Sequence, residues 1–227
     1  MSAAADAHLV AGEPASNDHP YLARKGVQAN GAIVDKVGPI AMVPSDAEPQ
    51  RSKAGNLLIP VRDMGGSHLL GDLATLGPLL IAEGFATAAT LHEATSLPVA
   101  VAFNGGKLEA VAKGYRERYP DRALLVAGDN NHRKELELGP DGQLKPNVGK
   151  VKAEAAAAAV GGATLLRPFK TEERGSDWND FAASRDRETF MRELRSGFAI
   201  AQRQTLTKEA KAERLAPQLT QEQVASL

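Results

Sequence analysis

The sequence has no cysteine, few aromatic residues and almost no net charge. Without cysteine, disulfide bonds and every cysteine-ligated zinc site are excluded. Aromatic residues are only 4% of the chain, so we expect a core built mainly from alanine, leucine and valine. Because the formal net charge is −1, a nucleic-acid partner would have to be held by a local basic face or by a metal ion.

Long apolar runs are also missing. No uncharged stretch approaches the ~20 apolar residues that a membrane-spanning helix needs. Residues 1–17 lack the basic segment and apolar core of a secretion signal. These features predict a soluble, cytoplasmic protein with no membrane partner. The length of 227 residues predicts one substantial domain with appendages.

Changes in composition divide the chain into four segments. The second is rich in glycine and proline with one clear strand at 57–61, and the fourth begins with an amphipathic helix over 185–203 and continues into a weakly helical, detached tail. The predicted segments are a disordered leader (1–17), a small β-rich subdomain (18–73), an α/β domain (74–184) and a C-terminal helical extension (185–227).

In the third segment, apolar runs of strand length alternate with helical patterns. Such alternation is typical of right-handed crossovers and of a parallel sheet with helices on both faces. We therefore predict an α/β fold with a Rossmann-like, parallel four-stranded sheet flanked by helices. The expected strands are 79–82, 98–103, 123–127 and 163–168, and the expected helices are 86–94, 108–119 and 148–160.

Acidic and amide residues follow several of these strands. Glu83 ends the first strand, Asp129 and Asn131 follow the third, and Asp177 and Asp180 lie beyond the fourth. The carboxyl ends of parallel strands meet at one edge of a sheet, so we expect these side chains to converge. Two carboxylates about 4 Å apart repel by on the order of 4 kcal/mol at an effective dielectric near 20, which favours a bound cation. Oxygen ligands select a hard cation such as Mg²⁺ (or Mn²⁺), which points to phosphate chemistry.

Each acidic residue also has a purely structural explanation. Glu83 lies near the start of the next helix, where its charge favours the helix dipole. The segment 129–131 has the composition of a turn, and Asp177 is a good helix cap. The sequence leaves both explanations open.

Basic residues gather after the third strand. Arg133, Lys134, Lys150 and Lys152 are candidates for binding nucleic-acid phosphates near the metal, although a solvated face is about equally compatible with them. Trp178 either stacks on a base or anchors the last helix in the core, and the second interpretation is favoured.

The order and spacing of these motifs resemble the Toprim domain, in particular that of DNA primases from conjugative plasmids and related mobile elements. The resemblance covers about residues 19–200. The motifs that carry it are Ile81-Ala82-Glu83-Gly84-Phe85, Ala102-Phe103-Asn104, Val126-Ala127-Gly128-Asp129-Asn130-Asn131-His132 and Asp177-Trp178-Asn179-Asp180-Phe181, with an entry segment from His19 to Asp63.

The resemblance implies roles for individual residues. Glu83 matches the family glutamate that acts in proton transfer, and Asp129 matches the first metal-binding aspartate of Asp-x-Asp. Asn131 stands where the second aspartate is usual, so the metal site would lose one negative charge unless Asp177 or Asp180 compensates.

The same resemblance implies a Mg²⁺-dependent nucleotidyltransferase that makes primers on single-stranded DNA from nucleoside triphosphates, in the replication or conjugation of a plasmid or mobile element. A helicase or relaxase is a further expected partner. A Toprim-type nuclease and a catalytically weakened DNA-binding accessory module are the alternatives. Asn131 and the short connection between Gly66 and Leu69 favour the accessory module, and without cysteine the zinc ribbon of many primases is excluded.

Overall fold

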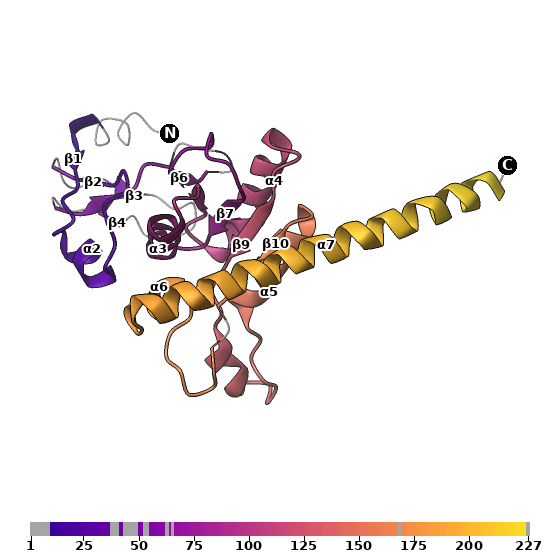
Figure 1. Cartoon of the computed structure of the whole chain (residues 1–227). Coiled ribbons are helices and arrows are strands. Elements are labelled where there is room, and N and C mark those ends of the chain that lie inside the picture. The colour runs from indigo at the N-terminus through magenta and orange to yellow at the C-terminus, as the bar shows by residue number, and fades with distance from the viewer. Residues whose placement is uncertain are drawn as a thin grey trace.

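The computed structural model describes residues 10–36, 41–42, 50–51, 55–61, 64, 66–167 and 169–225. It confirms the predicted α/β fold: helices cover both faces of a central sheet, and a smaller antiparallel unit lies at the N-terminal side (Figure 1). The central sheet has five strands in the order β10-β9-β7-β8-β6. They are β6 (His68–Leu70), β7 (Leu79–Ala82), β8 (Val99–Val101), β9 (Leu124–Ala127) and β10 (Ala163–Thr164).

Four of these strands are the parallel strands that the sequence predicts, while β6 is an addition. It runs antiparallel to β8 at the outside of the sheet, with His68 opposite Val101. With only three residues, β6 is too short to show any periodicity, and its pairing with β8 decides its conformation. The last predicted strand, 163–168, is shorter than expected, because β10 ends at Thr164.

The helices of the sheet domain begin and end close to the predicted residues. This holds for α3 (Phe85–Thr95), α4 (Leu108–Arg118) and α5 (Val148–Ala159). The other helices are α6 (Trp178–Ala183), for which no bounds were predicted, α7 (Arg187–Ala225), and the 3-10 helices η1 (Gly105–Lys107) and η2 (His132–Leu136).

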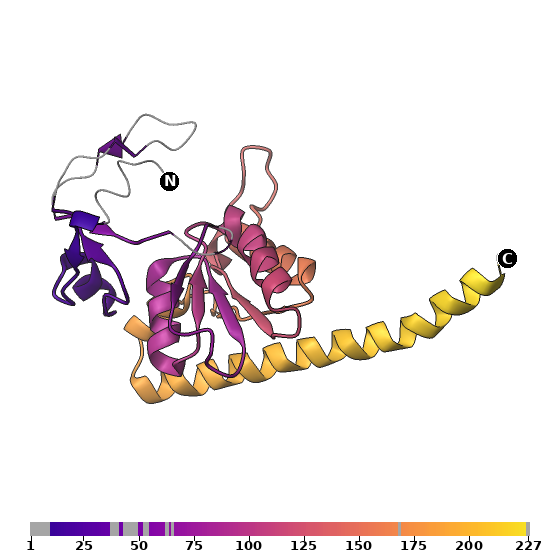
Figure 2. The ribbon, with the colours of Figure 1, turned by 90° about the horizontal axis from the view of Figure 1, so that it is seen from above.

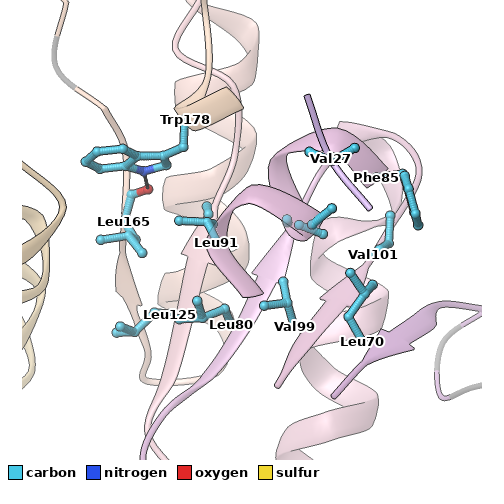
Figure 3. Close-up of a cluster of buried hydrophobic side chains, with 14 of the residues drawn as sticks. Val27, Leu70, Leu80, Phe85, Leu91, Val99, Val101, Leu125, Leu165 and Trp178 are labelled. Atoms are coloured by element: carbon cyan, nitrogen blue, oxygen red, sulfur yellow. Dashed lines mark hydrogen bonds between the residues drawn. The ribbon is translucent and has the colours of Figure 1, made fainter. Parts of the chain in front are cut away.

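Side chains of each strand alternate between two buried layers. In β7, Leu80 and Ala82 pack with α3, α6 and α7, whereas Leu79 and Ile81 pack with α4 and α5. Figure 3 shows the first layer, from Leu70 of β6 to Leu125 of β9 and Trp178 of α6. Because both faces are covered, β7 is apolar along its whole length, which explains the run in the sequence.

Trp178 anchors the C-terminal part of the chain. Its side chain is buried, its ring meets Phe181 and Phe190 edge-on, and its Nε1–H donates to the carbonyl oxygen of Leu165 over 2.9 Å. This confirms the structural interpretation and excludes stacking of Trp178 on a base.

The helix that starts at Arg187 is longer than the predicted 185–203. It continues as one element to Ala225, and its second half extends beyond the sheet domain (Figure 2). Near its middle, Gln204 Oε1 accepts from the backbone N–H of Thr164 (3.1 Å) and from its hydroxyl (3.3 Å), which fixes α7 beside β10. Within the part of the chain described above, no helix is both long and apolar enough to cross a lipid bilayer.

The N-terminal unit is small and built from short strands, as expected, and these strands pair antiparallel. It contains α2 (Pro20–Lys25), the sheet β1-β2-β5 and the two-stranded sheet β3-β4. The strands are β1 (Glu13–Pro14), β2 (Ile33–Val34), β3 (Ala41–Met42), β4 (Gln50–Arg51) and β5 (Leu57–Leu58).

Part of the predicted disordered leader belongs to this unit, because Glu13 and Pro14 pair with β2. The rest of the leader, residues 1–9, and the entry residues Arg62 and Asp63 lie outside the described residues. The buried ring of His68 joins the unit to the sheet, since its nitrogens lie 2.8 Å from the carbonyl oxygen of Pro60 and 3.1 Å from that of Asn30.

Candidate active site

Glu83 and Asp129 lie next to each other at the carboxyl ends of two neighbouring strands. The register pairs Ala82 of β7 with Ala127 of β9, and the backbone N–H of Glu83 donates to the carbonyl oxygen of Ala127 over 3.3 Å. The backbone nitrogen of Asp129 is 3.5 Å from Glu83 Oε2. The parallel pairing thus produces the adjacency that the sequence predicts for these two residues.

The acidic residues beyond the fourth strand also reach this edge, while acting as caps. Asp177 is the N-cap of α6, and its Oδ1 accepts from the N–H of Asp180 over 2.8 Å. Its Oδ2 accepts from the hydroxyl of Thr87 on α3 over 2.7 Å. Asp180 Oδ2 accepts from the N–H of Ser176 over 3.0 Å, and its Oδ1 lies 3.7 Å from Lys25 Nζ. The capping explanation of Asp177 is therefore confirmed, and both carboxylates are held in fixed orientations.

Asp129 is the electrostatic centre of this group. Its pKa rises from 3.8 to about 7, first because the carboxyl is largely buried and then because Glu83, Asp177 and Asp180 carry charge of the same sign. Lys25 opposes the rise. We call Glu83, Asp129, Asp177 and Asp180 the acidic rim. Acids from three separate segments therefore interact there with little positive charge to balance them.

Two glycines allow the chain to pack closely around the acidic rim. A Cβ on Gly105 would lie 3.1 Å from Glu83 Oε1 and 2.9 Å from Lys152 Cδ, so the carboxylate and the lysine side chain both cover this glycine. A Cβ on Gly149 would overlap the carbonyl oxygen of Asp129. A larger residue at either position would displace the rim.

The loop after β9 is held by Asn147, a buried N-cap of α5 that the sequence analysis did not single out. Its Oδ1 accepts from the N–H of Lys150 (3.2 Å) and of Asn131 (2.9 Å), and its Nδ2 donates to Asn130 Oδ1 over 2.7 Å. The expected start of a helix at residue 148 was the available signal, because asparagine is a favoured N-cap. No sequence signal pointed to Lys25 or Thr87, which reach the rim from distant segments.

The remaining predicted site residues lie at different distances from the acidic rim. The amide nitrogen of Asn131 packs against Gly149 at the start of α5. Lys134 pairs with Glu137 over 3.1 Å, whereas Arg133, Lys150 and Lys152 are exposed. The side chain of Lys152 and the carboxylate of Glu83 both lie against Gly105. This position makes Lys152 the strongest candidate among these cations for contact with a phosphate.

The donor set of the rim fits a hard divalent cation. It offers carboxylate oxygens only, and a bound cation would offset both the burial of Asp129 and the repulsion from Glu83, Asp177 and Asp180, which together raise the pKa of Asp129. Over the described stretches, no three acidic or histidine side chains already stand around a common metal position. The assignments of Asp129, Asn131, Asp177 and Asp180 as metal ligands therefore stay predictions, with Asp129 as the best-supported one.

Comparison with known proteins supports the interpretation of this edge. A family model described as the Toprim domain matches residues 78–188, which include β7 to β10 and the whole acidic rim. The chain contains a Toprim domain. The family resemblance that the motifs indicate is thereby confirmed. Toprim domains generally bind divalent metal ions, in agreement with the donor set of the rim.

Two curated proteins from Escherichia coli, both named "DNA primase TraC", are similar to this Toprim chain. They are 35% and 32% identical to it in alignments of 173 positions, and these alignments cover 70% of the chain. The chain spans only 12% and 16% of their lengths. No solved structure matches the chain.

Changing Asn131 to aspartate tests the departure from the Asp-x-Asp pattern. If Asn131 lies in the ligand shell, Asn131→Asp restores a negative charge, so we expect Mg²⁺ affinity to rise about tenfold. The metal-free protein should lose about 1 kcal/mol of stability, because a further charge is added beside Asp129. Calorimetric Mg²⁺ titration and thermal unfolding measure both effects. Asn56→Asp, an exposed change in the N-terminal unit, is the matched control. Unchanged Mg²⁺ affinity in Asn131→Asp would remove Asn131 from the metal site.

Proposed function

We propose that this chain is the Toprim nucleotidyltransferase module of a DNA primase. In the proposed reaction, the 3′-hydroxyl of a growing primer attacks the α-phosphoryl group of a nucleoside triphosphate on a single-stranded DNA template, and pyrophosphate leaves. The observation that carries the proposal is the contact between Glu83 and Asp129 inside an acidic rim that raises the pKa of Asp129 to about 7. The two relatives named DNA primase support the choice of reaction.

The roles of the residues follow from their positions. Glu83 accepts the proton of the attacking hydroxyl, because its carboxylate lies at the carboxyl end of β7 beside the backbone nitrogen of Asp129. Asp129 holds Mg²⁺ (or Mn²⁺), with Asp177 and Asp180 supplying further negative charge. When bound, the cation would stabilise the charge that develops on the transferred phosphoryl group. Thr87 and the α6 N-terminus keep the carboxylate of Asp177 in place.

The template would approach over the exposed cations beside the rim. Lys150 and Lys152 lie on the first two turns of α5, and Arg133 lies in η2, so all three are close in sequence to the ends of the loop after β9. Phosphate contacts from these residues provide the local basic face that a chain of nearly neutral net charge requires. We propose a plasmid or another mobile element as the replicated DNA, and the cytoplasm as the location.

Salt dependence tests this surface. We expect Lys152→Ala to weaken binding to single-stranded DNA and to lower the slope of log affinity against log salt by about 0.7, the value for one lost phosphate contact. Lys134→Ala is the matched control, because Lys134 already pairs with Glu137 and its loss should change the slope little. Fluorescence anisotropy of a labelled oligonucleotide at several salt concentrations measures both. Equal slopes in the two variants would contradict the assignment of Lys152.

One incubation separates the candidate functions. The protein is mixed with a single-stranded template, labelled ribonucleotides and Mg²⁺ or Mn²⁺. Labelled primers support the primase, and shortened template supports a Toprim nuclease that uses water in place of the 3′-hydroxyl. DNA binding with neither product supports an accessory module, which the amide at Asn131 favours. The accessory module would also fit a helicase or relaxase as the partner that supplies the catalytic activity.

A further inference from the structure

A second candidate site lies beside the C-terminal half of α3, where this helix packs against α6. A cavity of about 420 Å³ is bounded by the end of α2, the second half of α3, and the junction of α6 and α7. In Figure 1, α2 lies beside this junction. Buried Asn179 fixes the three walls, because its Nδ2 donates to the carbonyl oxygen of Lys25 (2.8 Å) and contacts Thr90 Oγ1 (2.9 Å). The cavity is therefore formed without a ligand.

The walls of the cavity are strongly basic. Four of the lining residues are cations and one is an acid; they are Arg24, Lys25, Arg185, Arg187 and Glu93. The acid is already engaged, because Glu93 Oε1 accepts from the N–H of Gln28 (2.8 Å) and from Asn30 Nδ2 (2.7 Å).

Two of the four cations are partly neutralised by carboxylates. Arg185 pairs with Glu173 over 2.6 Å, and Lys25 lies 3.7 Å from Asp180. Arg24 and Arg187 are exposed, and their guanidinium groups are available to a ligand. They belong to different helices, α2 and α7, so an anion in the cavity would be contacted from two elements.

The cavity extends along α3 away from Glu83, although one of its lining residues, Lys25, also pairs with Asp180 of the acidic rim. The α3 residues that line it are Thr90, Glu93 and Ala94, whereas Glu83 precedes the first residue of that helix, Phe85. With a rise of 1.5 Å per residue, Glu93 lies about 12 Å along α3 from Phe85. A ligand in the cavity is therefore a second ligand, and it is not held by the carboxylates of the acidic rim.

We propose that this cavity binds the polyphosphate group of a nucleotide. Guanidinium groups recognise phosphate oxygens through paired, charge-assisted hydrogen bonds. The volume is that of a small-molecule site, whereas single-stranded DNA is usually held in an extended groove. The site is separate from the substrate position at the rim. This inference rests on the proposed function in one respect only: a primase function favours a nucleotide over other phosphate compounds as the ligand.

Binding measurements on the full chain without Mg²⁺ test the proposal. The probes are ATP, inorganic pyrophosphate, adenosine and a single-stranded oligonucleotide. We expect ATP and pyrophosphate to bind and adenosine not to bind. The double variant Arg24→Gln/Arg187→Gln should weaken ATP and pyrophosphate binding at least about tenfold, since it removes charged hydrogen bonds from both helices.

Two controls make each outcome decisive. Arg195→Gln changes an exposed arginine of α7 outside the cavity, and Asp129→Asn changes the rim; both should keep ATP affinity within about twofold. Absence of ATP binding, or its loss in Asp129→Asn with retention in the double variant, would overturn the proposal. Loss of oligonucleotide binding alone in the double variant would assign the cavity to the DNA backbone and overturn it too. None of these assays measures primer synthesis. The proposed nucleotide site can therefore be confirmed or refuted even if the protein makes no primers.

Discussion

Glu83→Gln is expected to lower primer synthesis by about 10²- to 10⁴-fold, the contribution of a positioned general base. Glutamine has the same length and shape as glutamate, so it can occupy the space above Gly105 without moving Lys152. It cannot accept the proton of the attacking hydroxyl. Glu83 is not one of the proposed metal ligands. Its substitution should therefore change the affinities for Mg²⁺ and for DNA by less than about threefold.

The isosteric control for this experiment is Glu109→Gln. Glu109 pairs with Lys113 on the exposed side of α4, so its substitution removes one carboxylate that is not part of the acidic rim. Primer synthesis should be unchanged there. Synthesis by Glu83→Gln at the rate of the unmodified protein would show that another group, or solvent, takes the proton.

Asp129→Asn is expected to act in opposite directions on stability and on metal binding. In the metal-free protein the pKa of Asp129 lies at about 7, well above the 3.8 of an exposed aspartate. The protonated carboxyl therefore favours the folded state below about pH 4, and this contribution is lost as the pH rises to about 7. Asparagine avoids the cost of the buried charge, so the variant should be more stable by about 1–2 kcal/mol at pH 8, after allowance for solvent screening.

With Mg²⁺ the order should reverse. A cation that binds only the folded state stabilises the unmodified protein in proportion to the logarithm of its concentration, and the variant should lose most of this gain. Thermal unfolding at pH 5 and pH 8, with and without Mg²⁺, measures all four cases. Asp121→Asn, an exposed change before β9, should follow the unmodified protein. A variant that is less stable at pH 8 and still stabilised by Mg²⁺ would contradict the central role of Asp129.

The contact between Glu83 and Asp129 could be predicted because both residues follow apolar runs. A run that is apolar at every position implies a strand buried on both faces, and parallel pairing then fixes where its end lies. Asp177 could be placed near the same edge, but its second bond, to Thr87, depends on how α3 packs against α6. Local sequence contains no information about that contact.

Other features depend on contacts between segments that are far apart. Lys25 reaches Asp180 from a helix that precedes the sheet domain entirely, and β6 is a strand only because β8 pairs with it. The tail beyond residue 203 was predicted only as weakly helical, and not as a continuation of the preceding helix, since its sequence is polar and lacks a clear apolar face. In each case tertiary packing decides a structure for which the local pattern is weak.

The bond between Gln204 and Thr164 has a consequence for self-association. An outermost strand presents unpaired N–H groups that can template pairing with another molecule and lead to aggregation. In β10 the N–H of Thr164 is already occupied by a side chain of α7, and the strand has only two residues. The helix thus covers the β10 edge of the sheet against intermolecular strand addition. Chains cut before Gln204 should lose this protection and form sheet-linked aggregates.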